Sequence, residues 1–221
     1  MHNIVNNLLS IQNELKIKIK KLNFENYNPN IVAVSKTFTI KDILPLINHG
    51  HLHFGENKVQ ESIEKWTSIK SDFKDIKLHM IGKLQTNKVK YVVPLFDYIH
   101  SVDSLKLAEK ISQQQVKNNK IMKLFIQINI GNENQKSGIS IDQLDNFYNK
   151  CTNDLGLNVI GLMCLPPNDN KSQIYFSRMK ELVGKLNLKD ISMGMSNDYL
   201  EAINYQSTYL RIGSKIFGER N

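Results

Sequence analysis

Hydrophobic residues recur every three or four positions in the first part of the chain. This spacing predicts an amphipathic helix within residues 1–24, with its lysines facing solvent. The apolar stripe of this helix consists of Ile4, Leu8, Ile11, Leu15, Ile19 and Leu22. A membrane-surface patch at residues 16–21 is the alternative, but the stripe suits packing against a folded barrel better.

After Pro29 the pattern changes to short apolar or β-rich runs, each followed by a segment with helical spacing. Eight strands are predicted, at residues 31–36, 51–57, 77–82, 98–103, 123–130, 157–165, 190–196 and 209–217. Helices are predicted between them, at residues 40–48, 59–69, 87–94, 104–117, 141–150, 172–186 and 198–205. Alternating strands and helices imply parallel strands joined by right-handed crossovers. We therefore predict an α/β fold, a single (β/α)8 TIM barrel preceded by a helix.

An open, doubly wound sheet is the alternative to the barrel. Against it, no Gly-x-Gly-x-x-Gly turn follows the first strand, which ends in Lys36-Thr37-Phe38. No linker, low-complexity tract or internal repeat interrupts the alternation, and 221 residues suit one barrel. We expect one domain over residues 1–221, with residues 1–24 as its leading helix.

The composition is that of a globular protein, with 41% hydrophobic and 23% charged residues. Cys151 and Cys164 form neither a disulfide framework nor a zinc pattern, which predicts a reducing compartment. The N-terminal residues lack the features of a secretory signal, and no apolar run reaches the roughly 18 residues of a membrane span. We therefore expect a cytoplasmic protein without membrane contact.

A net charge of +8 permits binding to nucleic acid, since clustered lysines and arginines release counterions from phosphate backbones. Most of this charge is lysine scattered among asparagine and isoleucine, without an RNA-binding or helix-turn-helix signature. We therefore expect no specific nucleic-acid partner, although a nucleic-acid-binding protein remains a third class of function.

Functional groups in a barrel collect where strands pass into the following loops. Lys36 closes the first strand, where partial desolvation favours a neutral amine that condenses with an aldehyde to form a Schiff base. Ser196 and Gly213-Ser214 lie toward the ends of the last two strands, where barrels commonly bind phosphate. An amine and a phosphate site together suggest pyridoxal 5'-phosphate (PLP). The alternative for Ser196 is ordinary capping of a helix.

In this order the motifs are specific, and the sequence resembles the pyridoxal phosphate homeostasis protein family, single-domain relatives of the alanine racemase N-terminal barrel. The resemblance covers nearly the whole chain. Its segments are Ala33-Val34-Ser35-Lys36, Phe54-Gly55-Glu56-Asn57, His79-Met80-Ile81-Gly82, Gln85-Thr86-Asn87-Lys88, Lys136-Ser137-Gly138, Gly161-Leu162-Met163, Gly194-Met195-Ser196 and Arg211-Ile212-Gly213-Ser214-Lys215-Ile216-Phe217-Gly218. The chain departs from the family pattern at Leu78, usually aromatic, and at Lys83, often proline.

The resemblance implies that Lys36 carries PLP covalently and that Arg211 faces the pyridine nitrogen. It also implies that Ser196, Gly213 and Ser214 hold the phosphate, and that Asn57 and Met163 line the ring. Because a guanidinium stays protonated, the pyridine nitrogen should stay unprotonated and the cofactor should be a poor electron sink.

Racemisation needs acid-base groups on both faces of the substrate, and Lys36 supplies one. Related racemases complete their site with a second domain, for which we expect no length here. The resemblance therefore implies a PLP carrier or regulator in vitamin B6 homeostasis, without turnover or catalytic residues. We expect a monomer, although the sequence itself does not reveal the oligomeric state. PLP-dependent apoenzymes would be its partners. A PLP-dependent amino-acid racemase with a single lysine base is the alternative.

Other residues give weaker signals. His51 and His53 could share a face as metal ligands, but no third ligand has suitable spacing, so a structural role is favoured and no metal is expected. The same holds for His79. Cys164 lies in an apolar run and reads as a small buried hydrophobe. Lys136, after the fifth strand, is a hypothetical secondary cofactor contact or transfer site.

Overall fold

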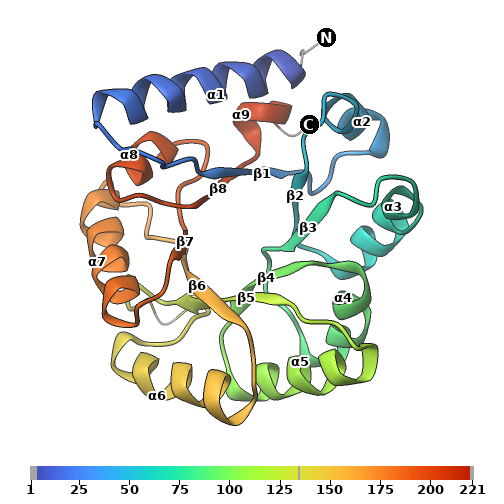
Figure 1. The fold of residues 1–221 in the computed structure, drawn as a ribbon, viewed down its shortest axis with the longest axis vertical. Coiled ribbons are helices and arrows are strands. Elements are labelled where there is room, and N and C mark those ends of the chain that lie inside the picture. Colours follow the sequence, from blue (N-terminus) through green and yellow to red (C-terminus); the bar gives the residue numbers. More distant parts are fainter. Residues whose placement is uncertain (1–3, 134, 220–221) are drawn as a thin grey trace.

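The computed structural model describes residues 4–133 and 135–219, in which eight parallel strands close into a barrel. Each strand pairs with the next along the chain, and the last pairs with the first. The ring of strands occupies the centre of the molecule (Figure 1). In order, the strands are β1 (Asn30–Val34), β2 (His53–Glu56), β3 (Lys77–Met80), β4 (Tyr98–Val102), β5 (Lys123–Ile128), β6 (Val159–Cys164), β7 (Asp190–Ser192) and β8 (Tyr209–Ile212). The predicted barrel is confirmed.

Helices surround the strands on the outside (Figure 1). They are α1 (Ile4–Lys21), α2 (Ile40–Asn48), α3 (Val59–Asp72), α4 (Val89–Leu95), α5 (Leu105–Asn118), α6 (Leu144–Asn149), α7 (Ser172–Lys185), α8 (Tyr199–Asn204) and α9 (Ser214–Phe217). Short 3-10 segments, η1 (Thr86–Lys88) and η2 (Ile141–Gln143), precede α4 and α6, and the π-helical η3 (Lys150–Asp154) follows α6. No helix in the described part of the chain is long and apolar enough to cross a membrane.

Two hydrophobic cores follow from the alternation of side chains along each strand. The larger core lies between the strands and the helices, where Phe54 of β2 packs on Trp66 of α3 with ring centroids 5.0 Å apart. A smaller cluster fills the inside of the barrel. It consists of Val32, Tyr98, Phe125, Met163 and Tyr209.

The leading helix α1 packs on the outside of the barrel, beside α2, α8 and α9 (Figure 1). The apolar stripe faces inward, and Leu8, Ile11 and Leu15 are buried. Asn7 Nδ2 adds a hydrogen bond to the carbonyl oxygen of Ile216, at 2.8 Å. The interpretation of the stripe as a packing surface is confirmed.

The last two strands end earlier than the sequence predicts. β7 stops at Ser192 because Gly194 adopts φ +88°, a left-handed conformation that a strand does not contain. The prediction of a strand over 209–217 is wrong beyond Ile212, since Ser214–Phe217 forms α9. Phe217 is buried by stacking on Phe38, with ring centroids 4.7 Å apart, so the apolar residues taken for a strand pack as one helical turn.

Candidate functional site

A cavity of about 560 Å³ opens at the carboxyl ends of the strands. Its walls come from the segments that follow β1, β2, β3, β6, β7 and β8, where barrel enzymes place their functional groups. Most of the residues predicted as the site line this one cavity. They are Lys36, Asn57, Ser196, Arg211, Gly213 and Ser214.

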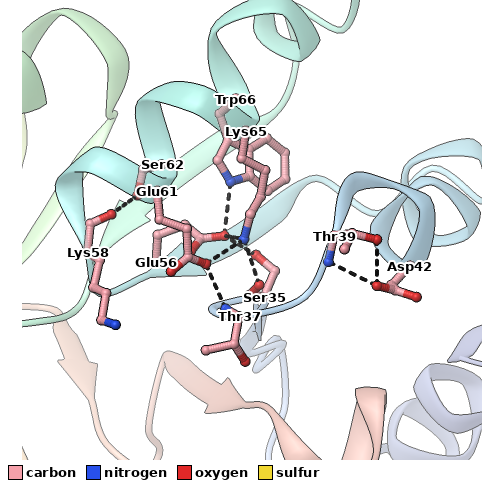
Figure 2. Close-up of polar contacts among 10 residues, drawn as sticks. All are labelled: Ser35, Thr37, Thr39, Asp42, Glu56, Lys58, Glu61, Ser62, Lys65 and Trp66. Carbon is pink, nitrogen blue, oxygen red and sulfur yellow. Dashed lines mark hydrogen bonds and ion pairs between the residues drawn. The ribbon is translucent and has the colours of Figure 1, made fainter. Parts of the chain in front are cut away.

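The residues on both sides of Lys36 are anchored to α3 (Figure 2). The Ser35 carbonyl oxygen accepts a hydrogen bond from Lys65 Nζ at 2.9 Å. The Thr37 N–H donates to Glu61 Oε1 at 2.7 Å. Lys65 Nζ and Glu61 Oε1 are themselves paired at 3.0 Å, so one ion pair on α3 holds the chain before and after Lys36. Thr37 adopts φ +71°, a conformation that such anchoring sustains.

Glu56, the last residue of β2, supports the same cluster (Figure 2). Its Oε1 atom accepts a hydrogen bond from Ser35 Oγ at 2.7 Å. The same atom accepts from Lys65 Nζ and from Trp66 Nε1, both at 3.0 Å. The side chain of Glu56 is fully buried and that of Lys65 is 7% exposed. A cation and two neutral donors on Oε1 compensate for much of the cost of this burial, although Oε2 is buried without a hydrogen-bond partner in the described residues.

Ser196 sits where the β7–α8 loop meets the start of α9. Its Oγ atom accepts hydrogen bonds from the N–H groups of Gly213 and Lys215, both at 3.3 Å. The N-cap of α8 is Asp198, whose Oδ1 accepts from the Met195 N–H at 2.6 Å. Ser196 therefore does not cap the helix that follows it. Because Ser196 Oγ accepts from two N–H groups, its own hydrogen is left to donate to an anion in the cavity, such as an oxygen of a bound phosphate.

Arg211 lies almost entirely buried in β8, with 4% of its surface exposed. One terminal nitrogen donates to Ser192 Oγ at 2.5 Å, and the other donates to the Cys164 carbonyl oxygen at 2.8 Å. Burial lowers the pKa of the guanidinium, which nevertheless remains a pure hydrogen-bond donor at neutral pH. Acceptors on β6 and β7 thus fix its orientation at the wall of the cavity.

Asn57 and Met163 occupy different environments. Asn57 lines the cavity, and its Oδ1 atom is buried without a hydrogen-bond partner in the described residues. Gly82 lies directly against it, since a Cβ atom at Gly82 would lie 2.5 Å from the Asn57 carbonyl oxygen. Met163 is fully buried in the interior cluster and is not among the lining residues. Its contact with a ring stays a prediction.

A smaller cavity of about 260 Å³ adjoins the first, and Ile81, Gly82 and Leu165 line both. Lys136 lines the smaller cavity. Its Nζ atom pairs with Glu133 Oε2 at 2.5 Å and donates to the Pro166 carbonyl oxygen at 3.2 Å.

Of the histidines singled out in the sequence, His53 and His79 are hydrogen-bonded to each other inside the barrel, whereas His51 Nε2 lies 2.9 Å from the His53 carbonyl oxygen. His53 Nδ1 lies 2.9 Å from His79 Nε2. Over residues 4–133 and 135–219, no three His, Cys, Asp or Glu side chains are grouped to hold a metal ion. Cys164 is fully buried, and burial raises the pKa of its thiol to about 12. Its interpretation as a small buried hydrophobe is confirmed.

Sequence reasoning missed the residues that position Lys36 and Arg211. Glu56 lies in the motif Phe54-Gly55-Glu56-Asn57, in which only Asn57 is assigned a role in the site. Lys65 is one of the many lysines of the chain and lies in a predicted helix. Ser192 lies inside the predicted strand at residues 190–196 and belongs to none of the motifs. A buried carboxyl at a strand end, which needs a nearby cation, is the signal that could have led to Lys65.

Comparison with known proteins identifies the family. Residues 11–221 match the family described as alanine racemase, N-terminal domain. A pyridoxal phosphate homeostasis protein of Haemophilus influenzae is 35% identical, with 99% of this chain and 97% of that protein covered. The chain belongs to the pyridoxal phosphate homeostasis protein family. A member from Aquifex aeolicus is 36% identical, with 86% of each protein covered.

Solved structures agree with membership of the pyridoxal phosphate homeostasis protein family. PipY of Synechococcus elongatus, solved with PLP bound, is 29% identical, with a TM-score of 0.80 and coverage of 92% of this chain and all of that chain. Alanine racemase of Clostridium difficile shares the fold with a TM-score of 0.74 at 14% identity. The present chain spans 57% of that racemase. The resemblance inferred from the sequence motifs is confirmed.

Proposed function

We propose that this protein binds PLP reversibly as a Schiff base on Lys36 and serves as a cytoplasmic carrier or regulator of PLP in vitamin B6 homeostasis. One observation carries the proposal: a single cavity brings together a strand-end amine, the hydroxyl-bearing residues Ser196 and Ser214, and a buried guanidinium. These groups match the aldehyde, the phosphate and the pyridine nitrogen of PLP. Family membership and the PLP-bound structure of PipY support the same cofactor.

The residues of the cavity fit PLP group by group. When bound, PLP supplies an aldehyde that condenses with a primary amine. Lys36 supplies this amine, and its position is fixed from α3. Ser196, Gly213 and Ser214 bind the phosphate through hydroxyl and backbone donors. Asn57 lines a cavity large enough for the ring, and its Oδ1 atom is buried without a hydrogen-bond partner in the described residues.

Arg211 determines the character of the site. Its guanidinium donates to the pyridine nitrogen. The hydrogen bonds to Ser192 Oγ and to the Cys164 carbonyl oxygen keep the guanidinium in a fixed orientation. A ring nitrogen that accepts from arginine stays unprotonated, which makes the bound cofactor a poor electron sink. A cofactor that is a poor electron sink favours reversible binding of PLP rather than sustained catalysis. The alternative is an amino-acid racemase that uses Lys36 as its single base.

The absorption spectrum tests the role of Lys36. The purified protein with PLP should show a Schiff-base band near the blue edge of the visible range, and Lys36→Ala should remove it. Lys58→Ala is the matched control, because Lys58 is exposed close by at the start of α3. A band that persists in Lys36→Ala would refute the assignment.

Deuterium exchange separates the carrier from the racemase. With PLP and alanine in deuterated water, a carrier should give no exchange at the α-carbon above that of free PLP. Exchange that depends on the protein and disappears in Lys36→Ala would establish the racemase instead.

Delivery of the cofactor is the remaining part of the proposal. We expect PLP-dependent apoenzymes to receive PLP from a monomeric protein, with Lys136 as a secondary contact during release. Lys136→Ala should then change the rate at which a PLP-dependent apoenzyme is loaded. Unchanged binding and release rates would remove Lys136 from the account.

A further inference from the structure

A row of polar side chains crosses the inside of the barrel and ends at Arg211. His53 and His79 are in contact, and His79 Nδ1 lies 2.9 Å from His100 Nε2. His100 Nδ1 lies 2.8 Å from Ser192 Oγ, which accepts from Arg211. Since β4 and β7 are not neighbours in the barrel, the bond between His100 and Ser192 must cross the interior.

Arginine gives this row a direction. Arg211 can only donate, so Ser192 Oγ accepts from it. His100 Nδ1 is the only other partner of this hydroxyl among the described residues, so the Ser192 hydrogen is directed to His100 Nδ1. His100 then carries its proton on Nε2 and donates to His79 Nδ1. By the same rule His79 carries its proton on Nε2 and donates to His53 Nδ1. Each neutral histidine has one donor and one acceptor nitrogen, so a single tautomer of each satisfies the whole row.

Aromatic rings hold the imidazoles in place. The ring of His79 stacks on Tyr98 with centroids 4.1 Å apart, and that of His100 stacks on Phe125 at 4.3 Å. Tyr209 packs against both histidines. His79, His100 and Ser192 are fully buried, which excludes water as a substitute partner along this part of the row.

Burial, together with nearby positive charge, keeps the histidines neutral. Burial lowers the pKa of His79 and His100 well below the usual value for histidine. Arg211 repels a proton at one end, and Lys77 and Lys123 do so at the other. Asp97 is the opposing carboxylate near His53, but burial and the lysines outweigh it and lower the pKa of His53 to about 4. The other titratable groups beside the row are His51, Lys70, Tyr98, Tyr209, Cys164 and Asp198, and Asp198 opposes the effect of burial on the pKa of Arg211.

We propose that Ser192, His100, His79 and His53 form one directional hydrogen-bonded chain that positions Arg211 against the pyridine nitrogen of PLP. This rests on the proposed function, to which it adds a set of positioning residues. The chain runs from the cofactor cavity to the opposite end of the barrel. There His53 lines a separate cavity of about 600 Å³ between the leading helix and the strands.

The first test needs no cofactor. Long-range ¹H–¹⁵N spectra of the full-length protein should give Nε2-protonated tautomers for His53, His79 and His100, with no titration between pH 8 and 5.5. An Nδ1-protonated tautomer at any of the three histidines, or a titration near pH 6.5, would contradict the proposed direction of the hydrogen-bonded row. In His53→Gln the His79 signals should shift, whereas in His49→Gln, at an exposed position outside the row, they should not.

The second test uses PLP labelled with ¹⁵N at the pyridine nitrogen. In Ser192→Ala the pyridine ¹⁵N resonance should move while the phosphate ³¹P resonance stays, because only the Arg211 end of the site has lost a partner. Release of PLP should be about tenfold faster, as expected for one hydrogen bond to a charged group. Ser192→Thr, which keeps the hydroxyl, should restore the wild-type ¹⁵N shift.

The two proposals fail in different ways. If the wild-type protein gives no signal from bound PLP, the proposed function is wrong. The histidine tautomers then still show whether the directional hydrogen-bonded row is present. If the tautomers are as expected but Ser192→Ala leaves the pyridine resonance unchanged, the chain does not position Arg211 and the inference is wrong. If Ser192→Ala moves both the pyridine ¹⁵N and the phosphate ³¹P resonance, the variant has lost structure generally. This result contradicts a positioning role unless Ser192→Thr restores both resonances.

Discussion

At the scale of single residues, the placement of Lys36 at the cavity depends on neighbours that do not line the cavity. Lys36 is placed by the chain before and after it, and both parts are tied to the ion pair of Lys65 and Glu61. Glu56 accepts from the same lysine while fully buried. The cluster therefore links the stability of the barrel to the geometry of the binding site.

Removal of Lys65 should be costly because it leaves the Glu56 carboxylate buried without a cation. We expect Lys65→Met to lower the free energy of unfolding by about 3–5 kcal/mol, measured by urea denaturation. The double variant Lys65→Met with Glu56→Gln should regain part of this loss, since no unpaired charge remains. Lys58→Met, at an exposed position, is the control. A loss in Lys65→Met no larger than in the control would contradict the account of the cluster.

Ser196 should act on the phosphate rather than on the Schiff base. We expect Ser196→Ala to weaken binding of PLP about tenfold, the effect of losing one hydrogen bond to a charged group. Binding of pyridoxal, which lacks the phosphate, should change little. Titrations followed by absorbance give both affinities, and an equal loss for the two ligands would place Ser196 away from the phosphate.

At the scale of elements, the left-handed Gly194 follows shortly after the end of β7, and the short helix α9 follows β8. The prediction of strands from apolar runs succeeded where a run was bounded by polar loops. It failed at Ile216 and Phe217, because a short apolar run has no period that separates strand from helix. The turn at Gly194 depends on its packing against Ala202 and Tyr199, which lie several residues further along the chain.

Gly194 should tolerate no side chain. Its φ of +88° disfavours any L-residue, and a Cβ atom would lie 2.7 Å from the Cβ of Ala202. We expect Gly194→Ala to lower the free energy of unfolding by about 3 kcal/mol in urea. Gly184→Ala on α7 is the matched control, since no atom lies within 4 Å of its added Cβ and a gain of about 0.5–1 kcal/mol is expected. Equal effects at the two glycines would refute the role of the turn.

At the scale of the whole molecule, most residues of the cavity could be predicted from the sequence, but their hydrogen-bond partners could not. Alternating strands and helices place Lys36, Ser196 and Arg211 at the same end of a barrel, and the structure gathers them around one cavity. The partners of Arg211 could not be predicted from spacing, because the path through His100 and Ser192 joins strands far apart in the chain.

The buried histidines should make the fold sensitive to acid. Burial lowers the pKa of His51 and His53 to about 4, and that of His79 and His100 well below the ordinary value. Unfolded histidines titrate near pH 6.5, so below this pH the unfolded chain binds more protons than the folded one. The free energy of unfolding must therefore fall as the pH falls from 6.5.

Urea denaturation at pH 7, 6 and 5 measures this dependence. His51 alone should lower the free energy of unfolding by about 2 kcal/mol at pH 5. His51→Gln should reduce the slope of the free energy of unfolding against pH. A free energy of unfolding that is constant from pH 7 to 5 would show that these histidines are not held neutral.

Borohydride reduction of the full-length protein, loaded with one equivalent of PLP and then mapped by peptide mass, tests the covalent linkage most directly. We expect a single reduced adduct on the peptide that contains Lys36, and none on that peptide in Lys36→Ala. An adduct mapped to Lys136 or to any other lysine, with Lys36 unmodified, would contradict the proposed function.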